Sequence, residues 1–219
     1  MRRITVIPML FAMMMLLTGC NIILPFVIIL APDPKVEAAY KLQDRPTVVF
    51  VDDRNGVVSP TTLRRLVADR ISQDLMLKKV VTRTISPRDA EAVARQRDSH
   101  NKMLAIDAIG RAVGAEQVIY VEIIEFKDRI DRYTLRPRGV CRVRVLDVTN
   151  RVRLFPPPDA AEASQIVEVL MDEMQAELYN SRASRSKIGE ALANQLGEMT
   201  AKLFYKYSGS KLGTNLRGG

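Results

Sequence analysis

Cys20 is the residue of this chain whose type and position most clearly allow chemistry. It follows a short basic start, an apolar run from Ile4 to Leu16 and the small residue Gly19. A basic region, an apolar region and small residues are the parts of an export signal that is later cleaved. A cut between Gly19 and Cys20 would leave the thiol on the new N-terminal residue, where its sulfur can act as a nucleophile.

The four residues Leu17-Thr18-Gly19-Cys20 resemble the lipobox of bacterial lipoproteins. The resemblance implies transfer of a diacylglyceryl group to the Cys20 sulfur, with residues 1–19 as signal peptide and residues 20–46 as lipidated N-terminus and tether. Acyl chains on Cys20 would hold the protein at the membrane, since each buried methylene contributes about 0.8 kcal/mol. The implied location is the exported side of the cell envelope. Asn21, where an Asp would favour the inner membrane, favours the inner leaflet of the outer membrane in a diderm cell.

An uncleaved transmembrane helix is the alternative interpretation of this segment. The apolar residues continue from Ile22 to Ala31, and about 20 apolar residues span a bilayer. Pro8 and Pro25 interrupt the run and disfavour one continuous helix. Both forms attach the chain to a membrane, whereas a third alternative, a soluble form, would not.

Composition bounds the fold and the partners. The chain has 219 residues and a formal net charge of +8, which is enough chain for one domain with a real core. We expect that domain at residues 47–207 and a disordered basic tail at residues 208–219. A basic exported protein meets anionic lipids, anionic wall polymers or protein partners rather than nucleic acid. We therefore expect a protein partner in the envelope, and the sequence leaves oligomerisation open.

No catalytic or cofactor-binding constellation is evident. His100 is the only histidine, and Cys141 is the only cysteine besides Cys20, so neither a disulfide framework nor a zinc-ligand spacing is present. We expect Cys141 to be a buried, inert thiol. The prediction is no enzyme and no cofactor. The alternative, an envelope hydrolase or polymer-modifying enzyme, requires a pocket in which Asp52, Asp53 or Glu122 converge.

Hydrophobic periodicity and turn residues predict an α/β (α+β) fold, with helices packed on a mixed sheet of four to five strands. The predicted order is β-α-β-α-α-β-β-β-α. The charged run Lys127–Arg138 is expected to be a loop, and Gln165–Met171 fits a strand or a helix start, with strand favoured. The strands are expected at Thr47–Val51, Val80–Ile85, Gln117–Phe126, Val140–Val148 and Val152–Phe155, and the helices at Pro60–Leu75, Pro87–Gln96, Met103–Val113 and Ser184–Tyr205.

The run Ile109–Glu122 resembles the helix, Gly-Ala-Asp, apolar strand signature of several envelope proteins. These are the curli-secretion lipoprotein, the amino-terminal domain of the Tol-system propeller protein, and the lipoprotein activators of penicillin-binding proteins. Arg144–Asn150 resembles their following hairpin, whereas Thr47–Asp53 ends in two aspartates in place of the usual apolar ending. The resemblance implies a role in envelope assembly or scaffolding without enzymatic activity. We do not expect a secretion pore, because Lys127–Arg138 is too short and too charged for membrane strands of about 9–11 residues.

Two features suggest binding surfaces. The first is a set of arginines near one predicted hairpin, which fits contact with an anionic polymer or an acidic partner: Arg142, Arg144, Arg151 and Arg153. The alternative is a solvated edge with cross-strand pairing to Asp147 or to glutamates. The second is the last helix, because an accessory subunit of a transport complex would need an apolar groove between that helix and the sheet.

Overall fold

The computed structural model describes residues 35–97, 105–129, 134–175, 179 and 181–209. Residues 36–207 belong to one compact unit, which carries the sheet and the helices. The elements confirm the predicted mixed α/β class. In chain order they are β1 (Lys35–Val36), β2 (Thr47–Asp52), α3 (Thr62–Leu77), β3 (Thr84–Ile85), α4 (Pro87–Arg97), α5 (Ile106–Ala112), β4 (Gln117–Arg129), β5 (Leu135–Asp147), β6 (Val152–Phe155), β7 (Gln165–Leu170), α6 (Arg182–Ala201), the 3₁₀ turn η2 (Lys202–Phe204) and β8 (Tyr207–Ser208).

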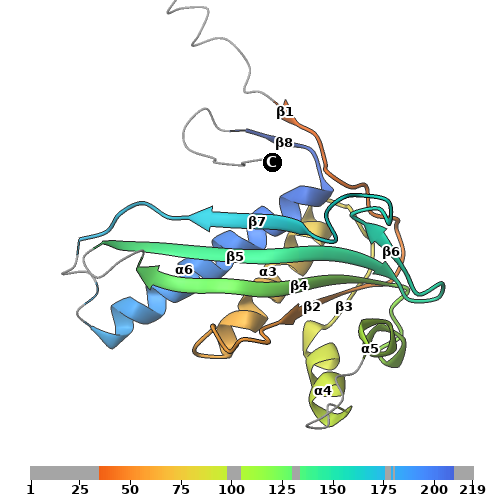
Figure 1. Cartoon of the computed structure of the whole chain (residues 1–219), viewed down its shortest axis with the longest axis horizontal. Helices are drawn as coiled ribbons and strands as arrows, with labels where there is room; N and C mark the ends of the chain where they lie inside the picture. Colours follow the sequence, from red (N-terminus) through yellow and green to blue (C-terminus); the bar gives the residue numbers. More distant parts are fainter. Residues whose placement is uncertain (1–34, 98–104, 130–133, 176–178, 180, 210–219) are drawn as a thin grey trace, which may run out of the picture. The chain divides into compact units, whose positions relative to one another are not determined.

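The main sheet has six strands in the order β3-β2-β4-β5-β6, with β7 pairing the other part of β5 (Figure 1). β2 is parallel to β3 and β4, and the remaining pairs are antiparallel. Five of the six residues of β2 are buried, as expected for a strand between parallel neighbours that is covered on both faces. Gln165–Leu170 is a strand, which is the alternative that the sequence favoured.

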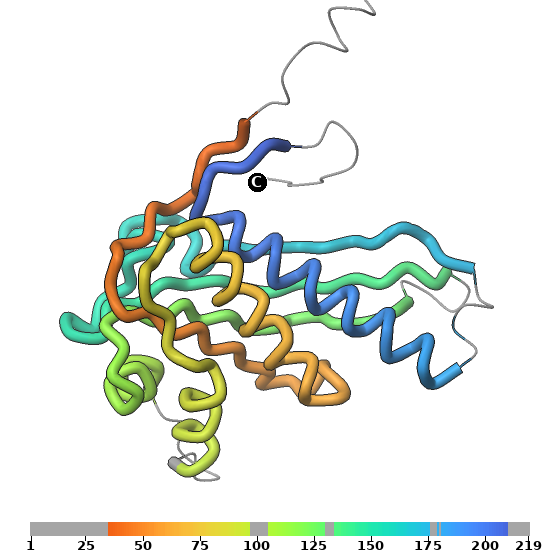
Figure 2. Tube along the Cα trace, turned by 180° about the vertical axis from the view of Figure 1, so that it is seen from behind, coloured from red at the N-terminus to blue at the C-terminus, as the bar shows by residue number. Residues whose placement is uncertain are grey.

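α3 and α6 cover one face of the sheet and lie side by side along it (Figure 2). Their close approach depends on Gly197 of α6, where a Cβ would come within 2.9 Å of the Val67 carbonyl oxygen. The core on this face joins the two helices to the sheet and includes Val67, Ile71, Ile119, Val143, Leu192 and Leu196. Burial of these side chains provides most of the apolar stabilisation of the fold.

α4 and α5 cover only part of the opposite face, against β2 and the beginning of β4. The smaller core there includes Val48, Phe50, Ile109, Val118 and Tyr120. Gly114 follows α5 with a φ of +75°, the left-handed conformation that glycine commonly supplies just after a helix. The rest of this face, along β5, carries exposed and half-buried arginines.

The sequence predicts a loop at Lys127–Arg138, and the structure shows that this prediction is wrong. β4 continues to Arg129 and β5 begins at Leu135. The residues of β5 alternate between buried and half-exposed from Leu135 onward, so the charges lie on one face and do not oppose strand formation. Arg138 pairs with Glu125 at 2.8 Å and with Glu168 at 2.9 Å. The segment Lys127–Arg138 therefore contributes residues to two long strands, β4 and β5, and its length does not exclude long strands at this place.

The segment before β2 packs on the domain. Leu42 is buried, the Tyr40 ring stacks on Phe155 at 5.3 Å, and the Tyr40 N–H donates to the Leu203 carbonyl at 3.0 Å. Beyond it, β1 pairs with β8. The described part of the chain contains no helix with the length and hydropathy that a membrane span requires. The run Ile4–Ala31, which would form the alternative transmembrane helix, lies outside the described residues.

Candidate binding site

The two cysteines differ in what the structure shows of them. Cys20 lies outside the described residues, so its lipidation stays a prediction. Cys141 is a buried free thiol, 3.6 Å from the Thr200 hydroxyl. Burial raises the pKa of the Cys141 thiol to about 12, so the sulfur is protonated and enclosed at neutral pH.

Arg142 and Arg144 lie on the partly open face of the sheet and share one acidic neighbour. Their guanidinium nitrogens are 4.0 and 3.9 Å from Glu122 Oε2. The Arg144 guanidinium also lies 4.8 Å from the centre of the Tyr120 ring, a cation–π distance. Glu122 is directly opposite Arg142 in the β4–β5 register, so these contacts are the cross-strand pairing that the sequence offered as an alternative.

Arg151 and Arg153 are engaged elsewhere. Arg151 Nε is 3.4 Å from the Asp107 carboxylate on α5. Arg153 donates to the backbone carbonyls of Ala163 at 2.9 Å and Pro157 at 3.0 Å. The structure therefore brings together only two of the four arginines, and contact of this set with an anionic partner stays a prediction.

Asp52 and Asp53 act in local structure. The Asp53 carboxylate accepts hydrogen bonds from the Val57 and Val58 N–H groups, both at 2.9 Å. Asp52 accepts from the Tyr120 hydroxyl at 2.7 Å and from Arg54 at 3.0 Å. Among the described residues, no group of three or more His, Cys, Asp or Glu side chains is placed to hold a metal ion.

A groove of about 600 Å³ lies between the N-terminal half of α6, the start of α3 and the neighbouring ends of β4 and β5. We call it the α3–α6 groove. Its apolar lining comes from segments far apart in the sequence: Val57, Leu63, Phe126, Pro137, Ile188 and Leu192. Val57, Phe126 and Ile188 are only half-buried, so the groove offers apolar surface to a second molecule.

The rim of the α3–α6 groove is basic. Lys127, Arg182 and Arg185 line it, against one carboxylate, Asp128. Lys127 pairs with Glu125 at 2.8 Å, whereas neither arginine pairs with a carboxylate of the described residues. Both arginines are exposed in the first turns of α6, where the helix dipole adds positive potential. The groove therefore suits a ligand that is apolar in its body and negatively charged at one end.

A groove between the last helix and the sheet was one expectation from the sequence, and Ile188 and Leu192 belong to that predicted helix, but no binding role was predicted for Arg182 or Arg185. Arg182, Arg185 and Ile188 recur at intervals of three along α6, and that spacing places residues on one helix face. The spacing did not predict a basic rim, because the helix was expected to begin at Ser184 and Arg182 lay outside it. The helix begins at Arg182, after Ser181, whose hydroxyl accepts from the Ser184 N–H at 3.0 Å. That bond is an N-cap, which fixes the start of α6 and with it the position of the rim.

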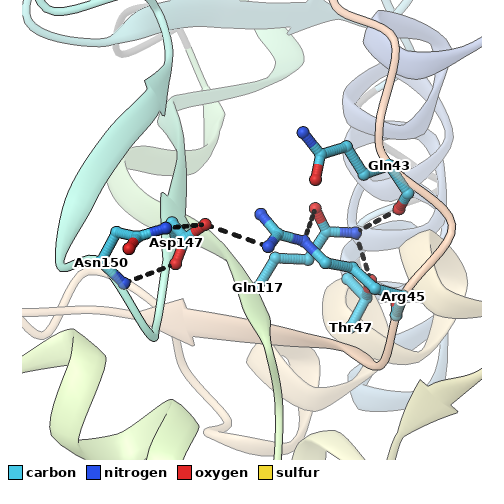
Figure 3. A network of polar contacts seen from close by, with 6 residues as sticks. All are labelled: Gln43, Arg45, Thr47, Gln117, Asp147 and Asn150. Carbon is cyan, nitrogen blue, oxygen red and sulfur yellow. Dashed lines mark hydrogen bonds and ion pairs between the residues drawn. The ribbon is translucent and has the colours of Figure 1, made fainter.

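A polar network closes the other end of the sheet (Figure 3). We call it the anchor-end network, because it lies at the end of the sheet nearer the segment that leads to the predicted anchor at Cys20. It comprises Gln43, Arg45, Thr47, Gln117, Asp147 and Asn150. The Gln117 amide donates to the Gln43 carbonyl at 2.8 Å and to the Thr47 hydroxyl at 2.6 Å. Arg45 donates to Asp147 at 3.0 Å. These bonds attach the chain that comes from the N-terminal side to β4 and β5.

The Asp147 carboxylate accepts hydrogen bonds from both Arg45 and Asn150. The Asn150 N–H donates to it at 2.7 Å, and its side chain is only 6% exposed. The Asn150 N–H first, and the Arg45 guanidinium second, hold the pKa of Asp147 below its ordinary value. Along β4, the distance from Gln117 to Phe126 is about 30 Å at about 3.3 Å per residue. The anchor-end network and the α3–α6 groove therefore lie at opposite ends of the sheet.

Comparisons with known proteins give distant matches among solved structures. No protein-family model matches the chain, and no curated protein matches it. Among solved structures, the hypothetical protein CT253 from Chlamydia trachomatis is 16% identical, with 72% of this chain and 98% of that chain covered and a TM-score of 0.42. A PelC dodecamer from Paraburkholderia phytofirmans is 12% identical, with coverages of 78% and 96% and a TM-score of 0.42.

The lipoprotein GNA1162 from Neisseria meningitidis is a third similar structure. It is 12% identical, with 70% of this chain and 96% of that chain covered and a TM-score of 0.39.

Proposed function

We propose that this protein is a lipid-anchored, non-enzymatic binding subunit of the bacterial cell envelope. In this proposal, acyl chains on Cys20 hold it at the membrane, and the α3–α6 groove docks a segment of a partner protein that is apolar and carries carboxylates. The observation that carries the proposal is the groove itself, in which a half-buried apolar lining meets two exposed arginines. The lipobox-like sequence around Cys20 supports the anchor.

Binding fits the groove better than catalysis does. General acid–base catalysis requires titratable groups within hydrogen-bond reach of one another and of a substrate. Asp52, Asp53 and Glu122, the acids of the alternative hydrolase hypothesis, do not line the groove. Asp52 and Asp53 are occupied in turn and strand contacts, and Glu122 faces two arginines.

The position of the groove favours a protein partner over the lipid of the anchoring membrane. The groove lies about 30 Å along β4 from the segment that leads to the anchor. A partner segment with an acidic end would place its carboxylate between Arg182 and Arg185 and its apolar side chains against Phe126 and Ile188. This geometry is the groove between the last helix and the sheet that an accessory subunit of a transport complex would need, so such a complex is the setting we favour.

Photo-crosslinking in intact cells tests the groove. We would replace Ile188 with the photoreactive amino acid benzoylphenylalanine and identify the crosslinked material by mass spectrometry. The expected product joins Ile188 to a segment of another envelope protein that is apolar and rich in Asp or Glu. The additional substitution Arg185→Glu should abolish this product, because it reverses charge on the rim.

Lys187→Glu is the matched control. It makes the same change of charge on the same helix, but Lys187 is exposed and does not line the groove, so the crosslink should persist. A crosslink only to lipid, a crosslink to a basic segment, or equal loss in the two charge variants would contradict the proposal.

A further inference from the structure

Two large apolar side chains are exposed at the end of α3, although the Met76 sulfur also accepts from the Thr84 hydroxyl at 2.9 Å. Met76 is 49% exposed and Leu77 is 77% exposed. The helix ends there, and the chain turns at Lys79, whose φ is +54°. Leu77 therefore lies at the tip of a turn, where an apolar side chain can insert into a membrane or contact another molecule.

The residues around this tip are basic. Lys78, Lys79 and Arg83 are exposed, and the sequence from Met76 to Arg83 contains no acid. Three acids lie near this tip, and each has other partners. Asp44 accepts hydrogen bonds from the Thr82 N–H at 2.7 Å and from its hydroxyl at 2.9 Å. Asp74 pairs with Arg70 at 3.3 Å, and Glu198 pairs with Lys202 at 2.8 Å. Apolar side chains among cations match an anionic lipid surface, which supplies phosphate groups and, below them, hydrocarbon.

The tip lies on the side of the domain that receives the N-terminal segment. The Lys78 ammonium group is 5.8 Å from the centre of the Tyr205 ring, and Tyr40 of the incoming segment bonds to Leu203 of η2. Figure 2 shows the chain after α3 beside the end of α6 and the incoming chain. The described N-terminal segment therefore joins the domain on the same side that presents Leu77.

We propose that residues Met76–Arg83 form a membrane-contact loop that rests on the bilayer to which the protein is anchored. Met76 and Leu77 enter the headgroup region, and Lys78, Lys79 and Arg83 contact anionic lipid phosphates. The inference rests on the proposed lipid anchor, which keeps the loop at high effective concentration near the bilayer. The loop orients the domain so that the α3–α6 groove, at the other end of β4, points away from the membrane.

The test uses the acylated full-length chain in vesicles of phosphatidylcholine and phosphatidylglycerol. Leu77→Cys would carry an environment-sensitive NBD dye, because acylated Cys20 has no free thiol and Cys141 is buried. We expect a blue shift and quenching by lipids with nitroxide-labelled acyl chains. Ile166→Cys on β7, exposed to 57%, is the control and should show neither. Lys78→Glu with Lys79→Glu should remove most of the quenching at position 77, as should vesicles without phosphatidylglycerol.

Flotation of the same samples separates the two proposals. Protein that floats with the vesicles while dyes at positions 77 and 166 give equal, water-like signals overturns the membrane-contact loop and leaves the anchor standing. Protein that does not float overturns the anchor and the inference that depends on it. Unchanged circular dichroism across the variants would show that the substitutions act at the membrane and not on folding.

Discussion

Arginines lie at both ends of the sheet, but in different environments. At the anchor end, Arg45 and Asp147 are largely buried and bonded to each other. At the groove end, Arg182 and Arg185 are exposed beside a half-buried apolar lining. Arginine at the first end holds the chain together. At the second end Arg185 donates to the Tyr179 carbonyl at 3.4 Å, but neither arginine pairs with a carboxylate of the described residues, so both can still bind an anionic group of another molecule. The comparison shows that burial and pairing distinguish a structural arginine from a candidate binding arginine better than charge does.

The anchor-end network should matter most for stability. We expect Asp147→Ala to lower the free energy of unfolding by about 3 kcal/mol, because it leaves the Arg45 charge buried and unpaired. Urea unfolding of the full-length protein in detergent measures this change. Asp128→Ala on the groove rim is the control and should change stability by less than about 0.5 kcal/mol. Equal losses of unfolding free energy in the two variants would contradict the view that the anchor end stabilises the fold more than the groove rim does.

The pH dependence of the free energy of unfolding should also differ between the two ends of the sheet. The folded state lowers the pKa of Asp147, so its contribution to stability is present above the unfolded pKa of about 3.9 and is lost as pH falls through the lower folded pKa. We expect Asp147→Asn to flatten the acid limb of a stability profile measured by urea unfolding at a series of pH values.

Glu125, near the groove end, is the carboxylate with which we compare the pH effect of Asp147. Partial burial raises its pKa, but hydrogen bonds from Lys127 and Arg138 outweigh burial and lower it. Its side chain is 26% exposed, so solvent screens these bonds more than it screens those of Asp147. Glu125→Gln should therefore flatten the acid limb less than Asp147→Asn does, and the reverse order would contradict this assignment.

The start of α6 is held locally. Ser181→Ala removes the N-cap bond to the Ser184 N–H, and we expect a loss of about 1 kcal/mol. Hydrogen exchange should show faster exchange in the first turn of α6 and unchanged exchange in the core strands. Ser186→Ala, further along the helix, is the comparison and should have a smaller effect. Faster exchange throughout the sheet would mean that the start of α6 stabilises the whole domain, as the anchor-end network does, and would contradict a local role.

The smallest stability effect is expected on the groove rim. Arg185→Glu should change the free energy of unfolding by less than about 0.5 kcal/mol, since the side chain is exposed. Thermal unfolding of this variant beside Lys187→Glu provides the measurement. A loss above about 1 kcal/mol in Arg185→Glu alone would assign this arginine to the fold and not to a ligand.

The sequence predicted most of the elements, and its errors have physical causes. The strand at Thr47–Val51 was predicted from its hydrophobic pattern, which is a local signal, and the structure has β2 at Thr47–Asp52. Lys127–Arg138 was misinterpreted as a loop because its charge hid an alternating pattern, in which Leu135 and Pro137 are buried and Arg136 and Arg138 are half-exposed.

The candidate site was harder to predict than the fold. Arg142 and Arg144 are two residues apart in a strand, a spacing that places both on one face. Arg151, by contrast, pairs with Asp107 on α5, which no local pattern indicates. The α3–α6 groove combines Leu63, Phe126 and Ile188 from three separate elements. Only the tertiary arrangement brings these residues together, and sequence spacing within one element cannot show it.

The most direct test of the account is the intact mass of the protein extracted from membranes, beside that of Cys20→Ala. We predict a wild-type mass that corresponds to residues 20–219 plus acyl chains, and the loss of this species in the variant. That result would establish the anchor that gives the two ends of the domain their different roles. An unmodified full-length mass in both proteins would contradict the account and would indicate that Ile4–Ala31 stays attached as an uncleaved segment.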